Sequence, residues 1–170
     1  MTGARTRAAG IAVLVAVIGF ATAGATFAGD GLRATLDGRP IPISRVGQLN
    51  CHDFDYPVIR CFSSPDALSA DIESRLSSSA TGAFLLLSGF VTAYEHDNYG
   101  GASISLSTDQ PSLSSIGWND RISSFKSFGA TGRFREDSPA GGFTYVFGAT
   151  AQVSSLGGTY NDKFSALYIP

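Results

Sequence analysis

The stretch Trp118–Ser124, with the sequence WNDRISS, recurs in weaker form as YNDKFSA at Tyr160–Ala166. Each copy begins with an aromatic residue, continues with an amide and a carboxylate, and contains a serine near its end. Carboxylate, amide and hydroxyl oxygens are the hard donors that Ca²⁺ prefers. A stretch that occurs twice in one chain also indicates a repeated architecture.

A second repeated element precedes each copy. Tyr94–Gly101 carries aromatic residues at its first and sixth positions and a glycine at its eighth. Phe134–Gly141 keeps this spacing, with Pro139 at the second aromatic position. Together the two elements form a unit of about forty residues that occurs twice, and such internal repeats define the architecture of a chain.

This combination of motifs resembles the Greek-key motif of the βγ-crystallin family in its microbial, calcium-binding form. Family domains contain two such motifs, and the resemblance covers about residues 86–170. It implies an all-β, two-Greek-key sandwich over residues 83–170, with motifs at about 90–129 and 130–170. The first copy matches at every motif position, whereas the second has Pro139 for an aromatic residue and Ala166 for the last serine.

Short β-prone runs separated by turns agree with an all-β domain. Ala102–Ser107 alternates apolar residues with serines, as a half-buried antiparallel strand does. Apolar or β-branched residues also dominate a set of further runs, which we predict as strands: 84–87, 90–94, 122–128, 143–147 and 164–169.

The resemblance implies that each calcium ion is shared between the motifs. The Asn-Asp-x-x-Ser segment of one motif would supply its serine hydroxyl and the carbonyl of the first x residue. The hairpin and the acidic residue of the partner motif would complete the shell. The implied ligands are Glu95, Asp120, the Arg121 carbonyl, Ser123, Glu136, Asp162, the Lys163 carbonyl and Ser165.

Few carboxylates per site predict weak binding of up to two calcium ions, at about 10⁻⁴–10⁻³ M or somewhat tighter, as in extracellular modules. The family pattern implies that Ser124 hydrogen-bonds back to its hairpin. Ala166 cannot do so, and we expect the less ordered second site to be the weaker one. Gly101 is expected in a conformation closed to residues with a Cβ. The remaining structural positions are Tyr94, Tyr99, Trp118, Asn119, Phe134, Gly141 and Asn161.

The N-terminus is typical of a secretory signal peptide, predicted over residues 1–28. Arg5 and Arg7 precede an apolar run from Ile11 to Phe20, and small residues of an Ala-x-Ala cleavage site follow. The alternative interpretation is a retained membrane anchor, although the run is marginal against the roughly 20 apolar residues that span a bilayer. We expect a secreted protein that has no membrane contact after cleavage.

Residues 29–82 are predicted to form a linker and a small cysteine-containing segment. The polar stretch 29–48 lacks periodicity and is interpreted as a linker that tethers nothing specific. Ser64 and Pro65 are typical of a helix start, and Leu68, Ile72 and Leu76 share one face of a helix predicted over 65–76.

The chain has two cysteines, Cys51 and Cys61. In an exported protein such a pair favours a disulfide, and the ten-residue separation closes a small loop. Two free thiols are the alternative. A zinc site is less well supported, because Cys51, His52 and Cys61 supply only three candidate ligands without the usual spacing.

Composition argues against several classes of function. The formal net charge is −2 at pH 7 and becomes more negative once Arg5 and Arg7 are removed, so a nucleic-acid-binding surface is not expected. His52 and His96 are the two histidines, and no nucleophile motif, glutamate pair or zinc spacing accompanies them. We therefore predict a non-enzyme.

The leading hypothesis is a secreted calcium-binding module that calcium stabilises, with an extracellular protein or surface as a further partner. The alternative is a secreted proteinase inhibitor or toxin-like protein, because some proteins of those classes resemble the same fold. They usually carry cysteines within the crystallin domain, whereas Cys51 and Cys61 precede it here.

Overall fold

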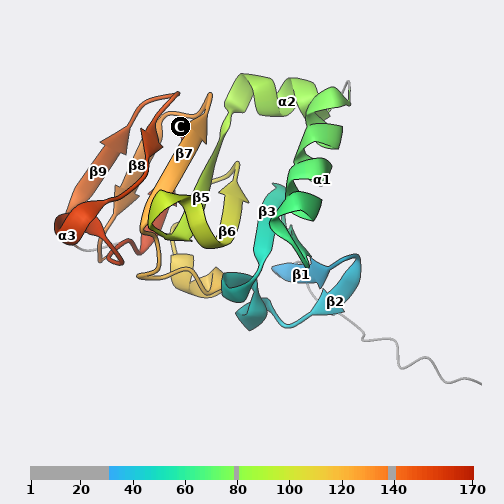
Figure 1. The fold of residues 1–170 in the computed structure, drawn as a ribbon, viewed down its shortest axis with the longest axis horizontal. Helices are drawn as coiled ribbons and strands as arrows, with labels where there is room; N and C mark the ends of the chain where they lie inside the picture. The colour runs from blue at the N-terminus through green and yellow to red at the C-terminus, as the bar shows by residue number, and fades with distance from the viewer. Residues whose placement is uncertain (1–30, 79–80, 138–140) are drawn as a thin grey trace, which may run out of the picture.

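The computed structural model describes residues 31–78, 81–137 and 141–170, which form two β-sheets with a helix alongside the larger one (Figure 1). The larger sheet has the strand order β10-β7-β5-β6-β3-β4-β1-β2, and the smaller has the order β11-β8-β9. The strands of the larger sheet are β1 Arg33–Leu36, β2 Arg39–Ile41, β3 Asn50–Asp55, β4 Val58–Phe62, β5 Phe90–His96, β6 Gly100–Leu106, β7 Ser124–Phe128 and β10 Gln152–Val153.

The smaller sheet contains β8 Gly132–Arg135, β9 Thr144–Phe147 and β11 Ala166–Tyr168. The α-helices are α1 Pro65–Ser77, α2 Thr81–Ser88 and α3 Gly157–Tyr160. Three 3₁₀ turns are η1 Ile43–Gln48, η2 Asp97–Tyr99 and η3 Leu113–Ile116. The predicted signal peptide lies outside the described residues. In the part of the chain that is described, no helix has the length and apolar character needed to cross a membrane.

The two repeats exchange strands between the sheets. β10 of the second repeat pairs with β7 of the first, and Gln110 of the first repeat pairs with Leu167 in β11 of the second. Neither sheet is therefore complete without both copies. This reciprocal pairing confirms the predicted all-β, two-Greek-key sandwich.

Aromatic side chains fill the space between the sheets. Phe134 stacks on Phe164 at 4.8 Å and meets Phe125 edge-on at 5.1 Å, measured between ring centroids. Trp118 and Ile122 are fully buried in the same core, as expected of the apolar positions in the repeated stretch. Burial of aromatic groups supplies most of the stabilisation in a core of this kind.

The interpretation of residues 29–48 as a linker is wrong for its described part. β1 and β2 form a hairpin, β1 runs parallel to β4, and β3 runs parallel to β6. Residues 33–62 thus extend the first repeat's sheet by four strands, visible as the blue and teal arrows in Figure 1. Strands of three and four residues carry too few side chains for a periodic signal, and their order comes from pairing with neighbours.

Cys51 and Cys61 form the predicted disulfide. They lie directly opposite each other in the antiparallel pair β3–β4, with Cα atoms 4.0 Å apart, and both are buried. No free cysteine exists among the described residues, so the free-thiol and zinc alternatives do not apply.

The helix predicted over residues 65–76 is present as α1. The Ser64 hydroxyl accepts a hydrogen bond from the Ala67 N–H at 3.2 Å, and Pro65 follows at the first helical position. Residues 84–87, predicted as a strand, lie instead in α2. A four-residue apolar run suits a buried strand or a buried helix equally. Gly89 ends α2 with φ +70°, and its N–H donates to the Leu85 carbonyl.

Buried polar side chains attach β3 to its neighbours. Asp53 is fully buried and accepts hydrogen bonds from the Ser107 N–H and hydroxyl at 2.7 and 2.9 Å. It also accepts from Thr108 at 2.8 Å and from Gln110 at 3.3 Å. His52 contacts Asp71 of α1 at 2.8 Å. The N-terminal strands are thereby joined both to the first repeat and to α1.

Candidate metal centre

Ser124 bonds to two main-chain groups of the first hairpin. The Ser124 hydroxyl donates to the His96 carbonyl at 2.6 Å and accepts from the Tyr99 N–H at 3.1 Å. Tyr94 and Tyr99 pack edge-on at 5.5 Å. Gly101 has φ +77°, and a Cβ there would lie 2.9 Å from the His96 side chain. The expected roles of Ser124 and Gly101 are therefore both seen.

The second hairpin begins one residue later than the sequence spacing indicates. Arg135 lies opposite Ala166 in its sheet, as Tyr94 lies opposite Ser124 in the other. The glycine with positive φ is Gly142, at +73°. The structural equivalent of Tyr94 is thus Arg135, and the prediction that Phe134 and Gly141 hold the motif positions is wrong.

Two observations explain why the second hairpin starts at Arg135 and not at Phe134. Phe134 points into the core, where it stacks on Phe164, so its aromatic ring serves packing between the sheets. Glu136 corresponds to Glu95, because its Oε2 accepts from the Phe143 N–H at 3.3 Å just as the Glu95 Oε2 accepts from the Ala102 N–H at 3.3 Å. Aligning the two glutamates, rather than the aromatic residues, gives the correct register.

The two Asn-Asp loops have the same conformation and lie against each other. Asp120 and Asp162 both have φ +53°, and the preceding asparagine donates to each carboxylate. The Asp120 N–H donates to the Phe164 carbonyl at 3.0 Å, and the Asp162 N–H donates to the Ile122 carbonyl at 3.1 Å. The contact is reciprocal, so each aspartate is placed by the other motif's loop.

Three oxygen atoms converge at the first site. The Ser123 hydroxyl lies 2.7 Å from the Glu95 carbonyl oxygen and 3.2 Å from Oδ1 of Asp162. We call these three groups the first oxygen cluster. Here Ser123 meets the hairpin of its own motif and the aspartate of the partner motif. The expected arrangement, in which the partner's hairpin completes the shell, is wrong on this point.

Asp120 occupies the position in its loop that Asp162 occupies in the other, with the same φ of +53°. Burial and the negative charges of Asp137, Glu136 and Asp162 raise the pKa of Asp120, so carboxylates of the second hairpin and of the partner loop both influence it. The backbone of Ser165 is placed as that of Ser123 is, since the Ser165 N–H donates to the Arg135 carbonyl at 2.8 Å and the Ser123 N–H donates to the Tyr94 carbonyl at 3.0 Å. We call Asp120, Ser165 and the Glu136 hairpin the second oxygen cluster.

Arg121 and Lys163 occupy equivalent positions in the two loops. The Arg121 guanidinium forms an ion pair with the Glu95 carboxylate, beside the first oxygen cluster. A cleft of about 270 Å³ opens here, lined by Glu95, His96, Asp120, Arg121 and Asp162. Lys163 follows Asp162 and is half-buried.

The donors in both clusters are of the kind that a hard cation prefers. Each combines carboxylate oxygen with hydroxyl and main-chain carbonyl oxygen, without imidazole or thiolate. Within the described residues, no group of three or more histidine, cysteine, aspartate or glutamate side chains could hold a metal ion. Any cation bound here would depend on the serine and carbonyl oxygens as well as on the carboxylates.

Comparison with known proteins identifies the family. A βγ-crystallin from an archaeon is 33% identical in sequence, over 49% of this chain and 99% of that one, with a TM-score of 0.44. The chain belongs to the βγ-crystallin family. Similar βγ-crystallin domains come from Clostridium beijerinckii (33% identity, 47% of this chain and 95% of that one, TM-score 0.42) and Flavobacterium johnsoniae (29%, 47% and 92%, 0.41).

No protein-family model matches the sequence, and no curated protein matches it. About half of the chain lies outside each of these βγ-crystallin matches.

Proposed function

We propose that this βγ-crystallin chain is a non-enzymatic calcium-binding module in which calcium joins the two motifs and stabilises the sandwich. The observation that carries the proposal is the first oxygen cluster. Ser123 and Glu95 of one motif meet Asp162 of the other within 3.2 Å. A cation bound to these oxygens connects both halves of the fold, so it favours the folded state by mass action.

The spacing of the oxygens is compatible with Ca²⁺ after a small outward movement. Calcium takes six to eight oxygens at about 2.3–2.6 Å, so two ligands at right angles lie about 3.4 Å apart. The Ser123 hydroxyl now donates its hydrogen to the Glu95 carbonyl. A bound calcium ion would need that hydrogen to point away, so that the Ser123 and Glu95 oxygens could both act as ligands. Water would complete the shell, and the low ligand charge would keep the affinity weak.

The charges around the two clusters favour the opposite order of calcium affinity from the one expected from the completeness of the two sequence motifs. The first cluster lies beside the Arg121 guanidinium, which repels a cation. The second lies beside Asp120, Glu136 and Asp137, and among the described residues neither Glu136 nor Asp137 forms an ion pair with a basic side chain. The second site is therefore proposed to be the stronger one.

The proposal places the protein outside the cell. Affinities of about 10⁻⁴–10⁻³ M are typical of extracellular modules. The disulfide between Cys51 and Cys61 fits an oxidising compartment. N-terminal sequencing of the exported protein tests this part, with a new N-terminus expected between about Ala23 and Gly29. An intact Met1 on a membrane-bound chain would contradict it.

Isothermal titration of the purified protein with calcium tests the binding itself. Two weak sites are expected for the wild type, and one site for Ser123→Ala. Ser127→Ala is the matched control, because Ser127 is equally buried and also donates to a main-chain carbonyl, that of Gly148 at 2.6 Å. It should lose stability but keep both sites. No heat of binding up to several millimolar calcium would overturn the proposal.

A further inference from the structure

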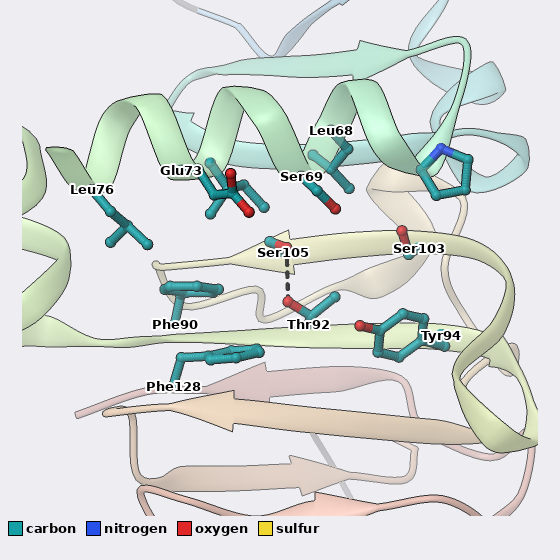
Figure 2. A pocket seen from close by; sticks show the side chains of 12 residues that line it. Leu68, Ser69, Glu73, Leu76, Phe90, Thr92, Tyr94, Ser103, Ser105 and Phe128 are labelled. Atoms are coloured by element: carbon teal, nitrogen blue, oxygen red, sulfur yellow. Dashed lines mark hydrogen bonds between the residues drawn. The ribbon is translucent and has the colours of Figure 1, made fainter. Parts of the chain in front are cut away.

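A pocket of about 400 Å³ lies between α1 and the outer face of the larger sheet (Figure 2). It shares no lining residue with the cleft beside the oxygen clusters. Leu68, Ile72 and Leu76 form the apolar face of α1 and turn toward it, but only Leu68 is fully buried there. The helix therefore stands off the sheet and leaves apolar surface facing a space of ligand size.

One end of the pocket is apolar and aromatic. Phe90 and Phe128 stack with ring centroids 4.7 Å apart, and Figure 2 shows Leu76 of α1 above them. Phe128 is 45% exposed, a large value for an aromatic side chain on a sheet. An apolar group inserted here would bury the exposed ring surface and gain the usual hydrophobic stabilisation.

Three serine and threonine hydroxyl groups on the pocket floor are already satisfied. Thr92 and Ser105 hydrogen-bond to each other at 2.8 Å, and Ser103 donates to the Asn50 side chain at 3.1 Å. These groups do not require a polar ligand. They form a neutral surface on which the body of a ligand can lie.

Glu73 supplies the charge of the pocket. Figure 2 shows its carboxylate reaching from α1 toward the sheet, beside Ser69. No basic side chain of the described chain pairs with it. Arg75, on the same helix, is engaged with Asp55 and Asp71. Lys126 lies over the Tyr99 ring at 4.0 Å and does not line the pocket. Glu73 is thus the one charged residue among those that line it.

We propose that this pocket binds a small organic cation, an aliphatic or aryl-alkyl amine. Its apolar part lies against Phe90, Phe128 and Leu76, and its ammonium group lies beside Glu73. Charge complementarity selects the amine, because a carboxylate in the same position would be repelled by Glu73. This proposal is independent of calcium binding.

Three probes of equal length test the proposal: 4-phenylbutylamine, 4-phenyl-1-butanol and 4-phenylbutanoate. Each is titrated into the purified protein, in the presence of a calcium chelator, and followed by two-dimensional NMR. The amine is expected to bind about fivefold more tightly than the alcohol, and the carboxylate most weakly. Shifts should be concentrated at Phe90, Phe128 and α1. Equal affinity for the three probes, stronger binding of the carboxylate, or no binding of the amine would overturn the proposal.

Two variants assign the binding to this pocket. Glu73→Gln should remove the preference for the amine over the alcohol, and Asp97→Asn, an equal change of charge outside the pocket, should retain it. Ser69→Phe should fill the pocket and abolish binding of the amine and the alcohol alike. Ser74→Phe is its control, because Ser74 is exposed on α1 but does not line the pocket. Retention of the amine preference in Glu73→Gln would contradict the proposal even if Ser69→Phe failed to fold.

Discussion

Ser123 of the first motif and Asp162 of the second approach each other across the domain, with Oγ 3.2 Å from Oδ1. The two loops that carry them are tied by reciprocal main-chain hydrogen bonds, so neither residue is positioned by its own motif alone. A substitution in one loop should therefore alter the oxygen cluster to which the other loop also contributes. Under the proposed function, calcium binding would therefore depend on both motifs.

Asp162→Ala should remove the first calcium site and leave the second, although Asp162 lies in the second motif. The reason is that the Asp162 carboxylate faces Ser123 and Glu95, while Ser165 serves the other cluster. At ten times Kd, each bound calcium stabilises the fold by about 1.4 kcal/mol. Half of the calcium-induced rise in Tm, roughly 3–6 °C per site for a chain of this size, should be lost.

Differential scanning calorimetry with calcium and with chelator measures this change. Asp97→Asn is a suitable control, because Asp97 is exposed in η2 and belongs to neither cluster. Loss of both sites in Asp162→Ala, or of neither, would show that the clusters are not divided as described.

Arg121→Gln should strengthen calcium binding at the first site. The guanidinium pairs with Glu95 at the edge of the first oxygen cluster, and both side chains are 30% exposed. Removal of one nearby positive charge under such solvent screening is worth about 0.2–1 kcal/mol, which corresponds to a gain of up to about fivefold in affinity. Isothermal titration measures it, with Arg133→Gln as a control for net charge. A weaker first site would mean that Arg121 holds the hairpin in its binding conformation.

Local side-chain chemistry made part of the site predictable from sequence. Residues 118–124 and 160–166 combine aromatic, amide, carboxylate and hydroxyl groups at fixed spacing, and both copies adopt the same loop. It was harder to predict which serine lies beside which aspartate. Ser123 meets Asp162 through a contact between two loops, and no local pattern states which serine faces which aspartate.

Two of the incorrect predictions concern side chains that suit two different environments. Phe134 satisfied the aromatic spacing of the hairpin, but its ring is used in the core, and the hairpin starts at Arg135. Residues 84–87 are apolar enough for a buried strand, yet they lie in α2, which ends just before Gly89. β1 and β2 flank the Asp37–Gly38 turn, but they are too short for a periodic signal, and β1 pairs in turn with β4.

Asp53→Ala should destabilise the protein by about 2–4 kcal/mol, the range for breaking a buried hydrogen-bond network. The Asp53 carboxylate accepts from Ser107, Thr108 and Gln110, and its removal leaves the buried Ser107 N–H without an acceptor. Urea denaturation followed by Trp118 fluorescence measures the loss. Asp53→Asn, which keeps one acceptor oxygen, should cost less. An effect below 0.5 kcal/mol, the usual range for surface substitutions, would mean that β3 is held by strand pairing alone.

Stability should fall on acidification because of His52. Burial lowers its pKa to about 4, although the hydrogen bond to Asp71 opposes that change and the charge of Arg75 adds to it. The ring is therefore neutral near pH 7. Its Nε2–H donates to Asp71 at 2.8 Å, and its Nδ1 accepts from the Phe54 N–H at 3.2 Å. Protonation would leave Nδ1 as a second donor facing that N–H, so the folded protein resists it.

The unfolded chain binds a proton on His52 below about pH 6.5, whereas the folded chain does so only below about pH 4. Between these values the unfolded state holds more protons, so the free energy of unfolding decreases as pH falls, by up to about 3 kcal/mol. Asp53 has the opposite effect on the free energy of unfolding as pH falls. Burial raises the pKa of its carboxyl group, although the four hydrogen bonds that it accepts lower that pKa. Comparison of wild type with His52→Gln cancels that contribution. Urea denaturation at pH 7 and pH 4.5 should show a smaller loss for His52→Gln, and equal losses in both proteins would rule out His52 as the source.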